Sequence, residues 1–402
     1  MKLLLFFGSG ISFDSGLPPV DTITKKILSG DWHSNTDSNF YPGFGQFGTS
    51  DHKVVRQQKF LRILSVFAEK YFQEKGLLKR QINYEDLYYL IQQIEFDLGN
   101  GVHNPAIGKF VSEAQKAIKA LCVPLGTEID FSLVRLAEEA SRFIHCGVRC
   151  LLKTPNTPKG LNCLNGLVES KKISNLDIAT LNHDLLIEKT LGENFSDGFV
   201  ERDGNVRFYC TNWFEKPNRI RLIKLHGSVN WQRSLTDLRY FIPLKDSFME
   251  WQVASGERLA SDPRPVVLIG SHNKLLNYRF GIFADLHFRF FQLLREHKTV
   301  VMSGYSWNDI GINSWLSEWF YWSSDNRLVL LHHKQLDEII VGINSIFQHR
   351  FRELVNRGQI ILIPKWFSEI SANDLLKEMK DCKLFTSSPH RRDARRRGRR
   401  GR

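Results

Sequence analysis

The sequence predicts an α/β fold in which a parallel sheet is covered by helices on both faces. Short, almost wholly apolar segments alternate with stretches of helical periodicity, and several of these segments stop at glycine or a small polar residue. Strands buried on both faces of a parallel sheet are continuous apolar runs, because neither face meets water. The predicted strands are residues 3–7, 176–181, 207–211, 220–225, 266–269, 299–303, 328–331 and 360–364.

The N-terminal unit is a strand, a glycine turn and a helix within residues 1–30. The helix opens at Pro18-Pro19 and carries Asp21 in its first turn, where an acidic side chain suits the helix dipole. Residues 31–52 are rich in glycine, serine and asparagine, which predicts a loop that covers the site.

Between residues 53 and 150 the apolar residues recur at helical spacing, which predicts a helical insertion packed against the sheet as a second module. The predicted division is a sheet domain of residues 1–52 and 151–385, the insertion of residues 53–150, and a tail of residues 386–402. The apolar positions that define the insertion include Phe60, Ile63, Leu64, Phe67, Leu87, Ile91, Leu133, Leu136 and Phe143.

The composition is that of a globular protein. A chain of 402 residues with 42% hydrophobic content can bury one large core or two modest ones, which excludes disorder of the whole. No window offers about 18 uninterrupted apolar residues, so no membrane span is expected, and the apolar opening 1–7 is too short for a signal peptide. Six scattered cysteines without a Cys-x-x-Cys pair predict reduced thiols, a cytoplasmic location and no metal site.

The tail carries much of the positive charge. Residues 391–402 hold eight arginines and one aspartate, a net +7 of the chain's +12. Charge of one sign at this density does not pack, so residues 386–402 are predicted to be disordered. Two interpretations stay open for this tail: contacts with nucleic acid or an acidic partner surface, or a solvated appendage.

Polar and glycine residues follow four predicted strands, and in a parallel sheet ligands bind at these carboxyl ends. Gly8 and Gly10 let the chain turn tightly off the first strand toward a pyrophosphate, and the next helix opens there. The dinucleotide pattern GxGxxG is incomplete, since Phe13 stands at its third glycine and the next glycine is Gly16. A tight turn without ligand is the alternative, and the fold expected is a Rossmann-like sheet.

Taken together, four segments resemble the sirtuin family, whose members cleave NAD at its nicotinamide glycosidic bond. Residues 8–18 (GSGISFDSGLP) resemble the family's GAGxS…GIP opening, and residues 180–184 (TLNHD) resemble its TQNxD. Residues 225–227 (LHG) resemble the catalytic His-Gly, and residues 300–306 (VVMSGYS) the late strand and GTS turn that bind adenosine. The resemblance spans roughly residues 1–365 and makes the sheet domain an expected NAD-binding domain.

The departures from the family's protein deacetylases narrow the expected activity. Pro19-Val20-Asp21 stands where those enzymes have the Asp-Phe-Arg that gates nicotinamide, and the four zinc-binding cysteines have no counterpart. The chain therefore resembles the zinc-less branch found in bacterial antiphage systems. This resemblance implies an NAD glycohydrolase, with NAD as the substrate, that acts as a triggered defence effector.

The resemblance and the chemistry of the side chains assign roles at the site. His226 is the expected general base and Asn182 positions water beside the ribose. Asp184 either stabilises positive charge or opens the helix of residues 185–191. The expected NAD-binding residues are Gly8, Ser9, Gly10 and Ser12 at the pyrophosphate, Gly270 after the strand 266–269, and Gly304, Ser306 and Asp309 at the adenosine ribose; Asp309 is equally natural as a helix start.

Two alternatives to the hydrolase stay open: a regulatory subunit that binds NAD or ADP-ribose without cleaving it, and an NAD-dependent protein deacylase. Because a pure sensor needs neither Asn182 nor His226, their presence favours the enzyme. The resemblance also implies a homo-oligomer, or a complex with an Argonaute-like or hexameric ATPase subunit.

Overall fold

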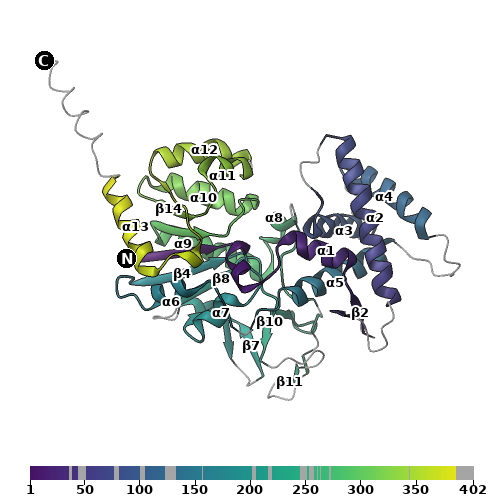
Figure 1. The fold of residues 1–402 in the computed structure, drawn as a ribbon. Coiled ribbons are helices and arrows are strands. Elements are labelled where there is room, and N and C mark those ends of the chain that lie inside the picture. The colour runs from purple at the N-terminus through teal and green to yellow at the C-terminus, as the bar shows by residue number, and fades with distance from the viewer. Residues whose placement is uncertain are drawn as a thin grey trace.

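A computed structural model of the chain describes residues 1–35, 39–43, 51–76, 81–99, 105–122, 133–155, 157–201, 205–215, 220–244, 251–252, 258–259, 261–262, 264–270, 273–343 and 345–385. The described residues form two parts that lie side by side (Figure 1). One part is built on a parallel sheet, and the other is a group of helices. The Arg-rich tail of residues 386–402 lies outside the described residues.

The parallel sheet confirms the predicted fold class. Its seven strands are all parallel, and the register sets Phe7 of β1 beside both Thr180 of β4 and Ser303 of β13, with Thr180 beside Lys224 of β8. The segments that follow these four strands therefore leave the sheet at one level. In spatial order the strands are β15 (Ile360–Ile363), β14 (Arg327–Leu331), β13 (Thr299–Ser303), β1 (Lys2–Phe7), β4 (Asn175–Thr180), β8 (Ile220–Lys224) and β5 (Phe195–Ser196).

Helices cover both faces of this sheet, as predicted. Side chains alternate across a strand, so Leu4 and Phe6 of β1 join one apolar cluster while Leu3, Leu5 and Phe7 join another. The first face carries α9 (Gly281–Glu296), α10 (Ile310–Trp322), α11 (Leu336–Gly342) and α12 (Ser345–Asn356). The second face carries α6 (Asn162–Val168), α7 (Leu186–Leu191), α13 (Ala372–Phe385) and the 3₁₀ helix η4 (Phe367–Glu369).

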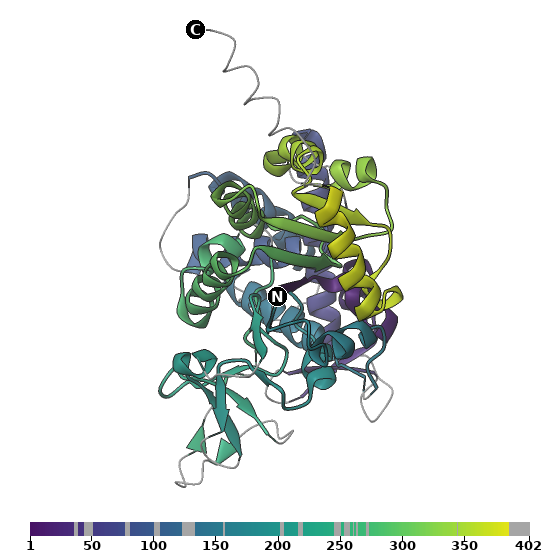
Figure 2. The ribbon, with the colours of Figure 1, turned by 90° about the vertical axis from the view of Figure 1, so that its left-hand side faces the viewer.

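Two predicted strands are not part of the parallel sheet. Residues 207–211 fall on β7, which pairs antiparallel with β6 and β10 in a small sheet that projects from the body of the molecule (Figure 2). Residues 266–269 form no strand and make one isolated bridge, from Val267 to Gly227. The apolar runs of these two segments are short and indicate only that the residues are buried. The local sequence does not show which sheet, if any, such a segment joins. The small sheet comprises β6 (Phe199–Glu201), β7 (Val206–Tyr209), β10 (Tyr240–Pro243) and β9 (Gln232–Arg233), and β11 (Trp251–Gln252) pairs with β12 (Arg258–Leu259).

The helical part has its own apolar cluster. Asp51 begins its longest helix, since its carboxylate accepts from the amides of Lys53 and Val54. The cluster also holds Val229 and Val267 from the sheet part, so the helices pack against the segments beside His226. The helices are α1 (Val20–Ser29), α2 (His52–Glu74), α3 (Tyr84–Gly99), α4 (Gly108–Cys122) and α5 (Leu133–Leu151).

The described part of the predicted loop 31–52 is more ordered than expected. It contains a small antiparallel pair, β2 (Trp32–Ser34) and β3 (Phe40–Pro42), and the N-cap and first residue of α2. Trp32 and Phe40 are buried and pack edge-on against Phe143 of α5. The polar composition signals a loop, but these two aromatic side chains fix the hairpin on the helices. The apolar cluster consequently begins at Ile23 of α1, ahead of the predicted boundary at residue 53.

The buried His145 of α5 makes the protein's stability depend on pH. Burial lowers the pKa of His145 to about 4, whereas an unfolded histidine titrates near 6.5. Between these two values the unfolded chain binds a proton that the folded chain does not, so the free energy of unfolding falls as the pH falls through this window. We expect His145→Gln to flatten this dependence in urea unfolding at pH 7, 6 and 5, with the exposed His349→Gln as the control. An unchanged slope in His145→Gln would contradict the assignment.

None of the helices in the described residues is both long enough and apolar enough to cross a bilayer.

Candidate functional site

The turns after β1 and β13 are packed directly on one another. The amide of Gly8 donates to the carbonyl of Ser303 at 3.0 Å, and that of Gly10 to the carbonyl of Gly304 at 3.0 Å. A Cβ on Gly8 would lie 2.4 Å from the Gly304 carbonyl oxygen, and one on Gly10 would lie 2.6 Å from the Gly304 Cα. The glycines thus allow two backbones to meet. Because both amides are engaged, a pyrophosphate at this turn would be bound by other groups of the 3₁₀ helix η1 (Ser9–Ser15).

Gly304 tolerates substitution poorly, because its φ of +70° is rarely adopted by other residues and an added Cβ would lie 2.6 Å from the Ile11 amide nitrogen. We expect Gly304→Ala to lower the free energy of unfolding by about 1–3 kcal/mol or more. The control is Gly342→Ala at the end of α11, where an added Cβ meets nothing within 4 Å. Urea denaturation of both variants tests this, and equal stability of the two would contradict it.

A buried hydrogen-bond chain joins the turn after β1 to the segment after β4. The Asn182 side-chain amide donates to Ser12 Oγ at 3.1 Å, and Ser12 Oγ donates to Asp184 Oδ2 at 2.8 Å. The other Asp184 oxygen accepts from the amide of Leu186 at 3.0 Å, so the carboxylate also opens α7. Ser12 therefore orients the Asn182 side chain. Its hydroxyl is engaged by protein groups in this structure, whereas the sequence predicted that it contacts a pyrophosphate. Asn182 Oδ1 is buried and has no hydrogen-bond partner among the described residues.

The side chain of Lys224, the last residue of β8, contacts the segment after β4. Its side chain is buried, donates to the main-chain carbonyl of Asp184, and forms an ion pair with Glu188 of α7 at 2.6 Å. Burial raises the pKa of Glu188, and the neighbouring ammonium opposes this effect. This ion pair fixes the position of the backbone that carries Asn182 and Asp184.

His226 leaves the sheet two residues after β8, and Gly227 makes this exit possible. Gly227 has a φ of +78°, and an added Cβ would lie 2.1 Å from the Val266 carbonyl oxygen. The amide of Leu268 donates to the carbonyl of His226 at 2.8 Å. The imidazole therefore lies on a backbone that is fixed on both sides.

The His226 ring contacts two groups that come from distant parts of the chain. Its Nε2 lies 3.0 Å from the Tyr278 hydroxyl and 3.0 Å from Asp309 Oδ2. Burial lowers the pKa of His226, and Asp309 partly opposes that shift. Asp309 also caps α10 by accepting from the amide of Ile312 at 3.0 Å. Tyr278 was not predicted, because it lies just after the short helix α8 (Asn273–Asn277) in a segment without a recognisable motif.

The remaining predicted site residues lie around these groups. Ser9 and Ser306 are exposed on the two packed turns, and Gly270, with a φ of +118°, ends the segment that pairs with His226. The ring of His183 lies 6.3 Å from that of His226, and its Nδ1 is buried with no hydrogen-bond partner in the part of the chain that the structure describes. Asn182, Asp184 and His226 are each less than one-tenth exposed. These three side chains are therefore covered by neighbouring segments in this conformation.

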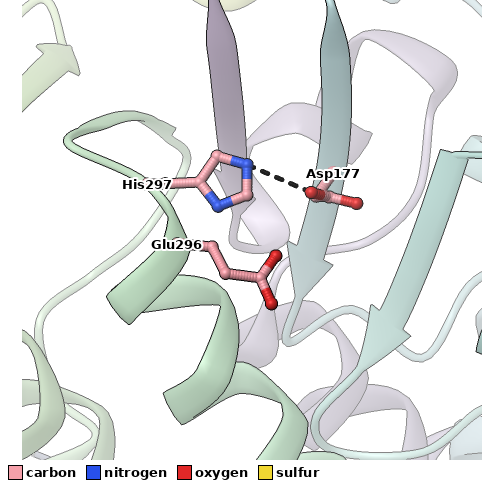
Figure 3. Close-up of side chains that lie close together, drawn as sticks. All are labelled: Asp177, Glu296 and His297. Atoms are coloured by element: carbon pink, nitrogen blue, oxygen red, sulfur yellow. Dashed lines mark ion pairs between the residues drawn. The ribbon is translucent and has the colours of Figure 1, made fainter. Parts of the chain in front are cut away.

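One cluster of side chains has the composition of a metal site, but it lies at the opposite, amino end of the sheet. Asp177 of β4, His297 and Glu296 of α9 lie close together, with His297 Nε2 3.0 Å from Asp177 (Figure 3). The Arg221 guanidinium donates to Asp177 at 2.7 and 2.8 Å and to Glu296 at 2.6 Å. The Arg221 guanidinium therefore supplies the positive charge that a metal ion would supply. The cluster is an ion-pair network that links β4, β8 and α9.

Two surface cavities lie away from these residues. One of about 480 Å³ lies between α9 and α10, lined by residues that include Phe291 and Trp322, and the other of about 290 Å³ lies between α10 and α12. Neither is lined by a residue of the predicted site.

Comparison with known proteins supports the predicted sirtuin-like family for the segment that carries most of the site. A family profile described as SIR2-like domain matches residues 177–341, which include Asn182, Asp184, His226 and Asp309. No curated protein matches the sequence.

Solved structures similar to this chain include three Sir2 proteins. A Sir2 homologue in complex with NAD is 13% identical, with 95% of this chain and 91% of that chain covered and a TM-score of 0.38. A mutant Sir2 homologue in complex with ADP-ribose is 11% identical, with 95% and 94% covered and a TM-score of 0.37. Sir2Tm bound to a propionylated peptide is 12% identical, with 89% and 93% covered and a TM-score of 0.32.

Proposed function

We propose that this protein is an NAD glycohydrolase, which converts NAD and water to nicotinamide and ADP-ribose. The observation that carries the proposal is the buried Oδ1 of Asn182, which has no hydrogen-bond partner among the residues described, while its amide group is held by Ser12 at the carboxyl end of the sheet. A buried acceptor without a partner is costly, and a bound water or a ribose hydroxyl would satisfy it. The SIR2-like match of residues 177–341 supports NAD as the ligand.

The chemistry of NAD requires few catalytic groups. Nicotinamide is a cationic leaving group, so the site mainly needs to stabilise the developing oxocarbenium ion and to supply a nucleophile. Asn182 positions the water or ribose hydroxyl through Oδ1, and His226 accepts the proton. Asp184 acts indirectly, because Ser12 connects its carboxylate to the Asn182 amide. Ser9 and Ser306 are accessible donors on the turns, where they would contact the pyrophosphate and the adenosine ribose, and the backbone of Gly8, Gly10, Gly270 and Gly304 would shape the pocket.

The direct test is to incubate the purified protein with NAD and to measure nicotinamide and ADP-ribose by chromatography. Equimolar formation of both products supports the proposal. Calorimetric binding of NAD or ADP-ribose without cleavage would instead favour the regulatory subunit. Removal of an acyl group from an acyl-lysine peptide, with NAD consumed in equal amount, would favour the deacylase.

The biological part of the proposal is a triggered antiphage effector in the cytoplasm. The closed site fits an enzyme that stays inactive until a trigger moves the covering segments, and the helical part, which packs on Val229 and Val267, is the part placed to transmit such a movement. We propose that it works as a homo-oligomer or beside an Argonaute-like or ATPase subunit. Phage challenge of cells that express the protein should lower their NAD content, and constant NAD with normal phage growth would argue against this role.

The proposal includes no structural zinc. Cys146, Cys150, Cys163 and Cys210 are free cysteines, and the group of side chains with metal-ligand geometry among the described residues, Asp177, Glu296 and His297, contains no cysteine. We expect elemental analysis to find less than one zinc per chain and chelators to leave the melting temperature unchanged. Stoichiometric zinc would revive the deacylase alternative.

A further inference from the structure

The side chains of Tyr278 and Asp309 both meet His226 at its Nε2 atom. This nitrogen lies 3.0 Å from the Tyr278 hydroxyl oxygen and 3.0 Å from Asp309 Oδ2, and the Tyr278 hydroxyl donates to the same Asp309 oxygen. All three side chains are largely buried, so little solvent competes for these contacts. The groups come from the end of β8, from the segment after α8 and from the start of α10.

The positions of the protons follow from these contacts. The pKa of Asp309 lies well below its usual range, since His226 and Tyr278 stabilise its charge against burial. The pKa of Tyr278 lies well above its usual range because of burial and the adjacent carboxylate. Tyr278 therefore keeps its proton and directs it at Asp309, which leaves two oxygens facing Nε2 as acceptors. His226 can satisfy both only with a proton on Nε2.

We propose that Asp309 and Tyr278 are positioning residues that hold His226 as the Nε2–H tautomer and stabilise its imidazolium, so that Nδ1 is the nitrogen that accepts the proton. This inference rests on the proposed NAD hydrolysis. In the reaction the water oxygen bonds to the ribose C1′ while nicotinamide leaves with the electron pair of the glycosidic bond. The water proton moves to Nδ1, and the resulting positive charge lies against Asp309. An aspartate has this function in the serine protease triad.

Both partners are held firmly enough for this function. Asp309 is fixed through its other oxygen, which accepts from the Ile312 amide at the start of α10. The Tyr278 ring stacks on that of His287 at 3.7 Å between centroids, and His287 Nε2 lies 3.2 Å from the carbonyl oxygen of Leu225. Both Asp309 oxygens are therefore engaged by protein groups in this conformation, and the expected contact of Asp309 with ribose hydroxyls stays a prediction.

Other charged and titratable groups act on the same imidazole. Lys274 of α8 lowers the pKa of His226, whereas Asp309 and Glu85 of α3 raise it. Lys274 and Glu85 form an ion pair at 3.1 Å, and Glu85 opposes the larger effect of Lys274 in part. His183 and His287 also lie nearby, and burial lowers the pKa of each. Asp309 is the only one of these groups that both touches Nε2 and carries a negative charge, so its removal should dominate any change in the titration of His226.

The tautomer can be measured without any reaction. Long-range ¹H–¹⁵N correlation spectra of the ¹⁵N-histidine-labelled full chain, assigned by loss of the signal in His226→Gln, should show the Nε2–H form of His226 in the parent protein. Asp309→Asn keeps an acceptor for the Ile312 amide and presents an NH₂ group to Nε2, so it should convert His226 to the Nδ1–H form. A parent protein with the Nδ1–H form, or a tautomer unaffected by Asp309→Asn, would overturn the inference whether or not NAD is hydrolysed.

The kinetic arm compares three variants. Asp309→Asn should lower kcat for NAD by about a hundredfold or more and move the acidic limb of the kcat/KM profile to lower pH, because the pKa of His226 falls. Tyr278→Phe keeps the stacked ring and should give a smaller loss. Asp177→Asn is the matched control, since Asp177 also lies 3.0 Å from a buried histidine but at the other end of the sheet; it should reduce stability and leave the pH profile in place. An unshifted profile in Asp309→Asn would overturn the inference, whereas an inactive parent protein would count against the proposed hydrolysis and leave the tautomer measurement decisive.

Discussion

His226→Ala is expected to abolish the release of nicotinamide while the protein still binds ADP-ribose. The imidazole acts on a proton in the transition state, and removal of such a base costs about a hundredfold or more in kcat. Asn182→Ala should act in the same direction, because Oδ1 would no longer position the nucleophile. Steady-state kinetics and calorimetric titration with ADP-ribose separate the loss of catalysis from the loss of binding.

The matched control for this prediction is His297→Gln. His297 is as buried as His226 but lies at the amino end of the sheet, against Asp177 (Figure 3). It should lower the melting temperature without a comparable loss of turnover in the protein that remains folded. If His226→Ala hydrolyses NAD at the parental rate, or if His297→Gln is equally inactive while folded, His226 is not the general base.

The sequence predicted which side chains lie close together where the sheet itself brings them together. Segments after β1, β4, β8 and β13 must meet, because parallel strands in register end at one level. For this reason Ser12, Asn182 and Asp184 could be predicted as neighbours from residues far apart in the sequence, and the structure joins them by hydrogen bonds. Their exact roles in catalysis remain predictions.

What the sequence did not predict depends on contacts that no local pattern encodes. Tyr278 follows the short helix α8, and its ring is held over His226 by stacking on His287, a contact that the local sequence does not show. Asp309 was predicted as a possible helix start. A helix cap uses only one carboxylate oxygen, and the sequence does not show that the second oxygen contacts His226. Likewise, Gly8 and Gly10 indicate a close approach without naming the approaching group, which here is the backbone of Gly304.

The largest effect on stability is expected from Lys224→Met. The ammonium is buried, and its removal leaves the Glu188 carboxylate without a counter-charge and the Asp184 carbonyl without its donor. Breaking one partner of a buried ion pair costs about 3–5 kcal/mol. Urea unfolding should show this loss at pH 7. The control is Lys298→Met, since Lys298 and Asp325 are exposed and 3.8 Å apart, and such pairs contribute about 0–1 kcal/mol.

The double variant Lys224→Met/Glu188→Leu tests whether the unpaired charge is the cause. Replacement of both partners by apolar side chains removes the buried carboxylate, so most of the lost stability should return. The pH dependence gives a second check. Burial already raises the pKa of Glu188, and without Lys224 the folded state should bind a proton more readily than the unfolded chain. The deficit of Lys224→Met relative to the parent should therefore shrink as the pH falls. A deficit that is independent of pH and persists in the double variant would mean that Lys224 stabilises the protein through packing of its side chain, and that the ion pair contributes little.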